Sequence, residues 1–514
     1  MATFNLSSML RESALANPDK PALILDDLRM SYRELDEAVS LVAAGLRARG
    51  IGRGDRVGVM LPNVPQFPVV YYGVLRAGCT VVPMNVLLKG PEVAYYLADS
   101  GASAFFFWSD FAADAMKGAA MSDALRLVVS VAPGPATPPP GAEDSFALLA
   151  AAAGRDTSMA TTQPDDTAVL LYTSGTTGHP KGAELTHFNV LMNCIVGARI
   201  AELRSDDVTL GTLPFFHAFG QSNILNTAIY CGATISLLPR FEPNHALQLI
   251  KRDKVTIFGG VPTMYVAFLK AYDEGDWDIS TLRLAISGGA ALPEQVLREF
   301  EQKFGAPILE GYGLSETSPS ATFNRPDRER KVGSIGLPIW GVELKIVDDS
   351  GASLGDGATG EICIRGHNVM KGYYNRPEAT AEAIVDGWFH TGDVGYRDSD
   401  GYYFIVDRKK ELVIRGGYNV YPREIEEVLY QHPAVLEVAV FGVPDASLGE
   451  EVAAAVALRP GMSATPEELI RFVKERVAAY KYPRTIHIMA SLPKGPTGKI
   501  QKLELKKQLV PAEA

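Results

Sequence analysis

Residues 170–187, LLYTSGTTGHPKGAELTH, combine glycines, hydroxyl side chains and one lysine directly after an apolar run. The apolar run, residues 168–172, predicts a buried strand, and the polar stretch after it predicts a loop. Backbone N–H groups and hydroxyls gathered in such a loop suit phosphate oxygens. The stretch departs from the pattern G-x-x-x-x-G-K-[ST], because Pro180 precedes Lys181 and Gly182 follows it. The prediction is a phosphate-binding loop, with a flexible surface turn as the alternative.

A second candidate segment is EGYGLSETSP, residues 310–319. The glycines on either side of Tyr312 let the backbone approach a flat ligand, on which the aromatic ring can stack. Glu316 could hold Mg²⁺, a hard cation that prefers oxygen ligands and substrate phosphates. The alternative is a turn with a solvated glutamate.

A third segment, residues 387–426, places Asp393 between glycines where a strand should begin. A carboxylate there can accept from a pair of hydroxyls, such as those of a ribose. Asp400 and Gly401 predict a hairpin turn, and Arg408 at the end of the returning strand could donate to the same ribose. The alternatives are a turn-forming Asp393 and a surface salt bridge of Arg408.

The last candidate, LPKGPTGKI at residues 492–500, places Lys499 behind a loop of Pro and Gly near the end of the chain. Most lysines in such positions are solvated surface charges. Here the rigid Pro-Gly-Pro frame and the apolar flanks Leu492 and Ile500 indicate a loop aimed at a site.

The elements that must position these residues follow an α/β pattern. Helix-like and strand-like segments alternate over residues 32–150 and again over about 185–310, which predicts largely parallel sheets covered by helices. Residues 131–144, rich in Pro, Gly and Ala, predict a surface connection. From residue 341 short strands with Gly and Asp turns predict a small β-rich subdomain.

The C-terminal hundred residues predict a separate α+β unit. Two helical segments alternate with the strand-like runs LEVAVFGV and EVAAAVAL. The second helix has Thr465 as its predicted N-cap, Pro466 at its first position and Glu468 completing a capping box. We place the boundary in the charged cluster DRKKELVIRGG, which divides the chain into residues 1–409 and 410–514.

Composition sets the broad class. The 514 residues, 47% hydrophobic and 21% charged, are ordinary for a globular protein of about three domains. A net charge of −11 argues against nucleic acid as a partner. Four dispersed cysteines favour small buried hydrophobes in a reducing compartment over disulfides or metal ligands. Neither a signal peptide nor an apolar run of about 18 residues is evident, so we expect a cytoplasmic protein without a membrane span.

Together the four segments resemble the adenylate-forming acyl-CoA synthetases, which include fatty acyl-CoA ligases, 4-coumarate–CoA ligases and firefly luciferase. The similarity extends over nearly the whole chain in the expected order. YTSGTTGHPKG looks like the phosphate loop of that family, and GYGLSET is similar to its motif Y-G-x-[ST]-E. The resemblance implies a large N-terminal domain, which binds ATP and the acid, and a mobile C-terminal domain.

The resemblance also assigns roles to residues. The loop over the phosphates corresponds to Thr173, Ser174, Gly175, Thr176, Thr177, Gly178 and Lys181. Lys499 corresponds to the catalytic lysine of the first half-reaction and Ser315 to a contact with the α-phosphate. Thr177 and Glu316 correspond to ligands of Mg²⁺. The remaining positions for ATP and coenzyme A are Gly288, Gly289, Ala290, Glu310, Gly311, Tyr312, Asp393, Arg408, Lys410, Asn419, Arg240, Gly416 and Gly417.

Within that set, the resemblance places Tyr312 against adenine and the pair Asp393 and Arg408 on the ribose. Lys410 corresponds to a hinge about which the C-terminal domain rotates. Gly416 and Gly417 would let pantetheine pass without a Cβ in its way. Arg240 corresponds to a basic contact with coenzyme A, with an ordinary surface arginine as the alternative.

The implied reaction has two steps, in which a carboxylate attacks the α-phosphorus of ATP and coenzyme A thiolate then attacks the acyl-adenylate. His217 in LPFFHAFGQSNIL corresponds to a residue beside the substrate carboxylate, with a packed structural histidine as the alternative. The acid-binding set is completed by Phe216, Gly220, Ser222 and Gly313. Ala267 stands where a ligase of malonate-type acids would need a cation, which favours an apolar monocarboxylic acid.

We therefore expect a small-molecule acid as the partner, first a medium- or long-chain fatty acid and second an aryl acid. Peripheral membrane contact stays open, and the chain is expected to be a monomer or a homodimer. A kinase or motor ATPase fits the phosphate loop but neither the missing Gly-Lys pair nor the distant Lys499. An adenylation enzyme that loads a carrier protein and a luciferase-like oxygenase remain alternatives. A nucleotide sensor without catalysis would be expected to have lost Lys499 or Glu316.

Overall fold

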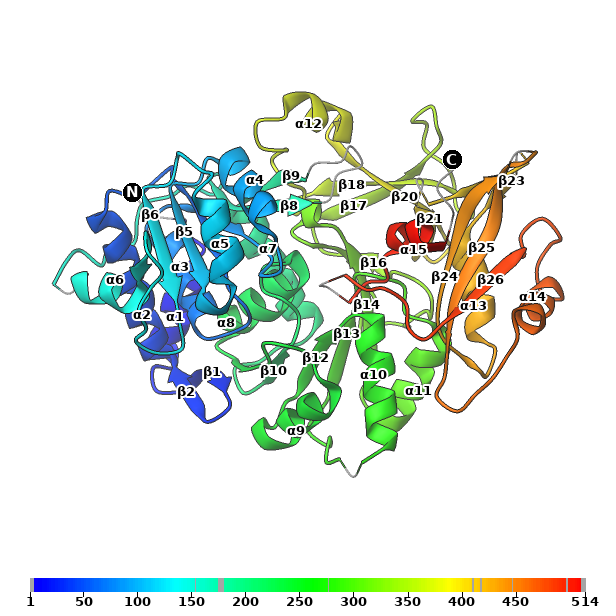
Figure 1. Cartoon of the computed structure of the whole chain (residues 1–514), viewed down its shortest axis with the longest axis horizontal. Helices are drawn as coiled ribbons and strands as arrows, with labels where there is room; N and C mark the ends of the chain where they lie inside the picture. The colour runs from blue at the N-terminus through cyan, green and yellow to red at the C-terminus, as the bar shows by residue number, and fades with distance from the viewer. Residues whose placement is uncertain are drawn as a thin grey trace.

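The computed structural model describes residues 4–152, 154–173, 180–275, 277–408, 411–416, 418–445, 447–495 and 498–509. Sheets with helices packed on them make up most of the chain (Figure 1). The largest hydrophobic core extends over the N-terminal sheets, and separate clusters lie around the C-terminal sheet.

The first sheet confirms the predicted parallel α/β arrangement. Its strands, in spatial order, are β7 (Glu143–Asp144), β6 (Leu127–Val131), β5 (Ala104–Trp108), β3 (Arg56–Met60), β4 (Thr80–Pro83), β8 (Thr167–Thr173) and β9 (Lys181–Thr186). All neighbours are parallel except β8 and β9, which form an antiparallel pair. The helices of this region are α2 (Tyr32–Ala48), α3 (Gln66–Arg76), α4 (Gly90–Ser100), α5 (Ala112–Ala119) and α6 (Ser145–Ala151), with the short turn η1 (Ser109–Phe111). The strand β5, AFFFW, is buried throughout, as is typical of a parallel strand covered on both faces.

The second sheet is parallel at its centre and antiparallel at its edges. Its strands, in spatial order, are β16 (Leu337–Pro338), β15 (Ser320–Phe323), β14 (Ile308–Gly313), β13 (Leu284–Ser287), β12 (Ile257–Gly260), β10 (Val208–Gly211), β11 (Thr234–Leu237), β1 (Pro21–Leu25) and β2 (Leu28–Ser31). The helices are α1 (Ser8–Ala16), α7 (His187–Ile200), α8 (Thr227–Cys231), α9 (Pro243–Asp253), α10 (Pro262–Asp273) and α11 (Glu294–Phe304). A π-helix, η2 (Phe219–Asn226), precedes α8.

The predicted β-rich subdomain is present. It consists of β17 (Val342–Val347), β18 (Gly360–Gly366), β19 (Ile384–Val385), β20 (Trp388–Arg397) and β21 (Tyr403–Arg408), with α12 (Pro377–Ala383) beside it. The turn between β20 and β21 contains Asp400 and Gly401, and Gly401 has a φ of +86°, which confirms the predicted hairpin.

The C-terminal α+β unit also matches the prediction. Its elements are β22 (Val413–Arg415), β23 (Tyr418–Val420), α13 (Pro422–Tyr430), β24 (Val435–Asp445), β25 (Gly449–Leu458), α14 (Pro466–Lys474), β26 (Thr485–Met489) and α15 (Lys502–Leu509). Thr465 caps α14 by accepting from the backbone N–H of Glu468, whose side chain completes the capping box. The predicted boundary at residues 409 and 410 lies outside the described residues and stays a prediction.

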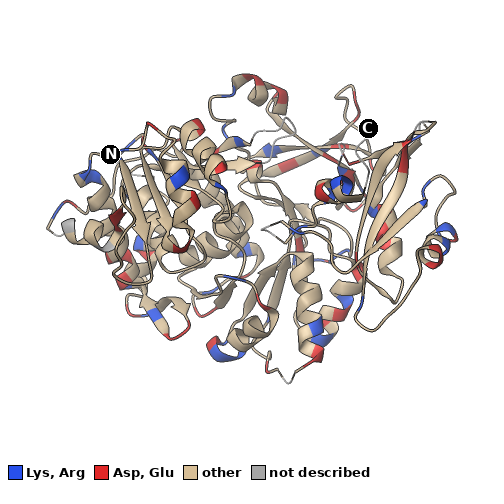
Figure 2. Ribbon diagram, in the orientation of Figure 1, with Lys and Arg blue, Asp and Glu red and all other residues tan. Residues whose placement is uncertain are grey.

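The surface and the cysteines agree with the composition. Acidic and basic residues are interspersed, for example along α11 and α14 (Figure 2). Cysteines form no disulfide among the described residues, and Cys79, Cys194 and Cys363 are buried. Within the described part of the chain, no helix is both long and apolar enough to cross a membrane.

One tight contact fixes the edge of the second sheet. The strand β14 turns through η3 (Ser315–Thr317) into β15, and Gly313 lies opposite Ser320 in the antiparallel pair. A Cβ on Gly313 would lie 1.7 Å from the backbone oxygen of Pro319. A backbone atom cannot move aside as a flexible side chain can, so only glycine fits there.

We therefore expect Gly313→Ala to destabilise the protein by about 3 kcal/mol or more, the upper range of overpacking changes. The thermal unfolding midpoint of the purified variant measures the loss. Gly52→Ala is the matched control, because apart from its chain neighbours no atom of the described residues lies within 4 Å of the position where its Cβ would stand. A midpoint for Gly313→Ala equal to that of the control would contradict this packing.

Candidate active site

A cavity of about 550 Å³ lies where the carboxyl ends of strands from both N-terminal sheets meet. Pro83 ends β4, Thr173 ends β8, Ser287 ends β13 and Gly313 ends β14, and all four line the cavity. In α/β folds ligands bind in crevices at this end of parallel strands, because the loops that carry functional groups follow the strands there.

The ends of the predicted phosphate loop open into this cavity. Thr173 and Lys181 lie opposite each other in the β8–β9 pair, and both line the cavity. The Lys181 ammonium lies 5.3 Å from the centre of the Tyr373 ring, and the Tyr95 hydroxyl donates to the Pro180 carbonyl at 2.7 Å. The loop itself, with Ser174, Gly175, Thr176, Thr177 and Gly178, lies outside the described residues.

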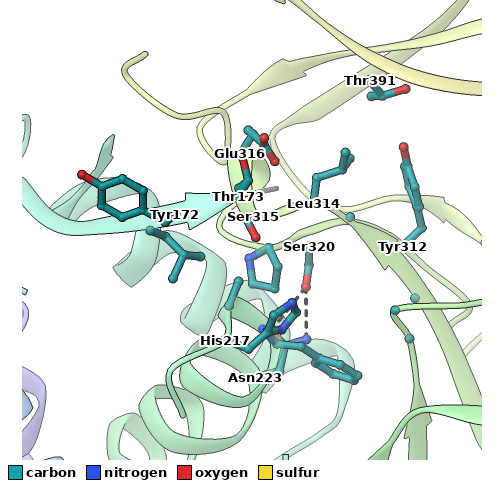
Figure 3. A pocket seen from close by; sticks show the side chains of 18 of the residues that line it. Tyr172, Thr173, His217, Asn223, Tyr312, Leu314, Ser315, Glu316, Ser320 and Thr391 are labelled. Carbon is teal, nitrogen blue, oxygen red and sulfur yellow. Dashed lines mark hydrogen bonds between the residues drawn. The ribbon is translucent and has the colours of Figure 1, made fainter. Parts of the chain in front are cut away.

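Glu316 is positioned by η3 and lines the cavity next to Ser315 (Figure 3). One carboxylate oxygen, Oε1, accepts from the Tyr373 hydroxyl at 2.9 Å, and the Glu316 carbonyl accepts from the backbone N–H of Met370 at 2.8 Å. No group of three or more His, Cys, Asp and Glu side chains suited to a metal occurs among the described residues. The single carboxylate of Glu316 fits Mg²⁺, because this ion is commonly held by one or two carboxylates together with substrate phosphates.

Asp393 and Arg408 lie opposite each other on β20 and β21, as the hairpin prediction requires. Arg408 Nε lies 2.9 Å from Asp393 Oδ1, and the Tyr312 hydroxyl donates to Asp393 Oδ2 at 2.6 Å. Burial raises the pKa of Asp393, and the Arg408 charge opposes that rise. The side chain of Arg408 stays 42% exposed and lines the cavity, so it can donate to a polar ligand there.

Lys499 enters the cavity from the C-terminal unit. Its loop is closed by a hydrogen bond from the Gly495 N–H to the Lys499 carbonyl at 2.8 Å, and Thr263 Oγ1 donates to the Gly498 carbonyl at 3.0 Å. A Cβ on Gly289 would lie 3.4 Å from Lys499 Cε. Surrounding protein and the Arg408 charge lower the pKa of Lys499 to about 8, although the side chain is still reached by solvent through the open cavity.

His217 lines the cavity just before the π-helix η2. Its Nδ1 accepts from the Phe219 backbone N–H at 3.3 Å. Burial lowers the pKa of His217 to about 4, and the Lys499 charge adds to this effect. The ring is therefore neutral near pH 7, and because Nδ1 accepts, Nε2 carries the proton and can donate to a substrate oxygen.

Several predicted residues join this cavity, and others do not. The lining also includes Gly288, Gly289, Gly311, Tyr312, Gly313 and Phe216. The predicted residues that are not among the described lining residues are Ala290, Glu310, Gly220, Ser222, Arg240, Asp393, Gly416 and Asn419. Lys410 and Gly417 lie outside the described residues.

Packing accounts for some of the residues away from the cavity. A Cβ on Gly220 would lie 2.3 Å from the Pro214 carbonyl oxygen, so this glycine is required by the turn into η2. Glu310 is buried, and its carboxylate accepts from the backbone of Leu292 and Gly333, while burial raises its pKa to about 7. Gly416 and Asn419 belong to the β22–β23 hairpin of the C-terminal unit.

Some cavity residues had no recognisable signal in the sequence. Tyr373 contacts Glu316 because its loop pairs with β9 through Ala183, a contact between distant segments. Asn223 Nδ2 donates to Ser320 Oγ at 3.2 Å inside the cavity (Figure 3). Neither residue belongs to a motif with diagnostic spacing, although Asn223 follows His217 within the segment that the family resemblance assigns to the acid.

Comparisons with known proteins agree with this arrangement. The chain matches the family of AMP-binding enzymes over residues 10–374 and the C-terminal domain of AMP-binding enzymes over residues 424–499. It is 38% identical to a long-chain-fatty-acid–CoA ligase of Bacillus subtilis (strain 168), with 97% of this chain and 94% of that protein covered. It is 36% identical to a feruloyl-CoA synthase of an Amycolatopsis species, with 99% and 100% covered.

Among solved structures, the anthranilate CoA ligase AuaEII in complex with anthranoyl-AMP superposes with a TM-score of 0.92 at 30% identity, with 98% of this chain and 97% of that chain covered. Both the family match and these identities extend over nearly the whole chain. The chain therefore belongs to the family of AMP-binding enzymes and is an AMP-forming acid–CoA ligase, which uses ATP, Mg²⁺ and coenzyme A.

Proposed function

We propose that this chain activates an apolar carboxylic acid with ATP, releases pyrophosphate, and transfers the acyl group to coenzyme A. The observation that carries this proposal is the meeting of Lys499, Glu316 and Arg408 in one cavity, although they come from three distant segments. An anionic carboxylate and a triphosphate repel each other, so positive charge at the reacting centre is the main requirement of the first step.

In the proposed first step Lys499 donates to the oxygens between the acid and the α-phosphate. His217, neutral and protonated on Nε2, orients the substrate carboxylate without adding a charge. Mg²⁺ bound at Glu316 would neutralise phosphate charge. Arg408, which lines the cavity, and its partner Asp393 would hold the ribose, and Gly288 and Gly289 would leave room for the base beside Tyr312.

For the second step we propose that the C-terminal unit turns about Lys410. The turn would withdraw Lys499 and bring the loop at Gly416, together with Asn419, toward the acyl-adenylate. Arg240, which is exposed, would then contact coenzyme A. A carrier protein in place of coenzyme A is the alternative acceptor.

We propose a medium- or long-chain fatty acid as the substrate, and an aryl acid as the second candidate. The support for a fatty acid is the 38% identity to the Bacillus ligase over 97% of the chain. The aryl alternative is supported by the aromatic side chains Phe216, Phe219 and Phe323 around the cavity. Ala267 lies on α10 and is not among the described lining residues, so it carries no weight in this choice.

Lys499→Ala should slow formation of the acyl-adenylate by about 10²–10³-fold, as for loss of one donor to transition-state charge. Exchange of labelled pyrophosphate into ATP measures this step. Thioester formation from supplied acyl-adenylate should largely survive. Lys494→Ala is the matched control, because Lys494 lies in the same loop but pairs with Glu437. Equal losses in both half-reactions would contradict the proposed role of Lys499.

The pH dependence of the same step should follow the charge of Lys499. Its pKa is lowered to about 8, so the ammonium is present below pH 8 and is lost as the pH rises above it. The kcat/KM for ATP, which reports the free enzyme, should therefore fall about tenfold per pH unit above 8. Lys499→Arg should show lower activity without this fall, because arginine stays charged. A fall of equal steepness in Lys499→Arg would assign it to another group.

A panel of acids separates the two substrate candidates. The kcat/KM for coenzyme A thioester formation should rise from butyrate toward octanoate or longer acids, by up to about fourfold for each buried methylene. Malonate should be poor, since a second carboxylate would have to be buried without a partner. A cinnamate used more efficiently than any fatty acid would favour the aryl candidate and leave the ligase intact.

A further inference from the structure

A hydrogen-bonded pair closes one side of the cavity near His217. Asn223 Nδ2 donates to Ser320 Oγ at 3.2 Å, and both residues line the cavity (Figure 3). The backbone of Ser320 is held in turn, because its carbonyl accepts from Asn193 Nδ2 and from Asn368 Nδ2, each at 2.9 Å. Ser320 is thus held in place by its backbone contacts, and the Asn223 side chain closes this side of the cavity by reaching across to Ser320.

A second, much smaller cavity of about 20 Å³ lies on the other side of this wall. Asn223 and Phe323 line both cavities. The other lining residues of the small cavity are Gly197, Ile200, Ala201, Leu203, Thr209, Thr227, Ile257, Ile286 and Leu309. The hydroxyl of Thr227 is used locally, since it donates to the Ser222 carbonyl at 2.7 Å. Thr209 Oγ1 is buried and makes no hydrogen bond among the described residues. Most of the other lining side chains are aliphatic, so the space suits a methyl or methylene group and not a charged one.

The two shared residues differ in how firmly they are held. A Cβ on Gly311 would lie 2.4 Å from the Phe323 ring, so the ring is packed flat against the glycine of the opposite strand. Asn223 instead lies on the π-helix η2 and reaches Ser320 only through its amide. Truncation of Asn223 would join the two cavities and leave Phe323 in place.

We propose that Asn223 sets the depth of the acyl site, and that the small apolar cavity behind it is an extension that the wild-type side chain closes off. This inference rests on the proposed function, in which the acyl group lies beside His217. The terminal methylenes of an aliphatic acid are the groups that would enter the extension. Asn223 is thus a specificity-determining residue and takes no part in the chemistry.

Asn223→Ala should lengthen the preferred aliphatic acid by about two methylenes, because the removed amide and the small cavity each make room for about one. The ratio of kcat/KM between that acid and the wild-type optimum should rise on the order of tenfold. A series of acids of increasing length, assayed for coenzyme A thioester, measures the profile. Asn223→Ser should shift the chain-length profile less, because its hydroxyl can keep a polar contact to Ser320. This variant replaces Asn223→Ala in the test if the alanine variant folds poorly.

Gly197→Ala provides a matched control from the far side of the small cavity. Gly197 lies on α7, and among the described residues outside that helix the one atom within 4 Å of its added Cβ would be Thr227 Oγ1, at 3.8 Å. The methyl group thus enters the extension without a clash, and alanine suits a helix better than glycine does. Gly197→Ala alone should leave the wild-type profile unchanged, and in combination with Asn223→Ala it should reverse part of the shift.

A second readout separates this inference from the proposed function. Calorimetry with non-reactive acyl-sulfamoyl adenosines of increasing chain length measures binding without the ligase reaction, and the same shift should appear there. If the analogues show the shift while no acid yields a thioester, the depth limit is supported and the proposed ligase substrate class is wrong. An unchanged length profile in both Asn223 variants, or a changed profile in Gly197→Ala alone, would overturn the inference.

Discussion

The site depends on one contact between distant parts of the chain, in which Thr263 Oγ1 donates to the Gly498 carbonyl. Gly498 has a φ of +79°, and a Cβ on it would approach Val261 and Thr263 to about 3 Å, so a glycine is needed for the loop to lie against the second sheet. With the loop held in this way, the Lys499 side chain passes Gly289 and enters the cavity. Without this contact the cavity would retain its carboxylates but lack the lysine from the C-terminal unit.

The charges around that lysine balance one another. Asp393 is 2% exposed and is held by Arg408 and by the Tyr312 hydroxyl, so the carboxylate does not need Lys499 as its partner. Arg408 then acts on Lys499 mainly by repulsion, which lowers the pKa of the lysine together with burial. His217 is kept neutral by the same surroundings. The arrangement leaves a positive group directed at the cavity and available for an anionic substrate.

The wall of the cavity formed by β14, β15 and η2 has a different role, because it limits the space for the acyl group and does not bind a charge. At Gly311 and Gly313 the backbone of β14 packs so closely against Phe323 and Pro319 that these groups have little room to move. The polar bridge from Asn223 to Ser320 completes this wall. A wall of this kind selects acids by size and leaves the reacting groups unaffected, which allows substrate preference and catalysis to vary independently within one fold.

The sequence by itself was sufficient for the alternation of strands and helices, the Asp400–Gly401 hairpin and the Thr465 cap, because each depends on residues within a few positions of one another. The hairpin also predicted that Asp393 and Arg408 would meet. The family resemblance supplied the proposed roles of Lys499 and Glu316, which lie too far apart in sequence for their spacing to indicate a role.

Only the tertiary structure decided which residues share the cavity. Tyr373 reaches Glu316 through a loop that pairs with β9, and Asn223 reaches Ser320 through the close packing of a π-helix on a strand. It also placed Gly220 and Glu310 outside the described cavity lining, with the position of a Cβ on Gly220 close to the Pro214 carbonyl and the Glu310 carboxylate bonded to backbone N–H groups; their expected ligand roles stay predictions. Local patterns fix the conformation of a segment, but contacts between distant segments depend on how whole sheets and helices pack. A residue type with no diagnostic spacing therefore acquires its neighbours only in the folded chain.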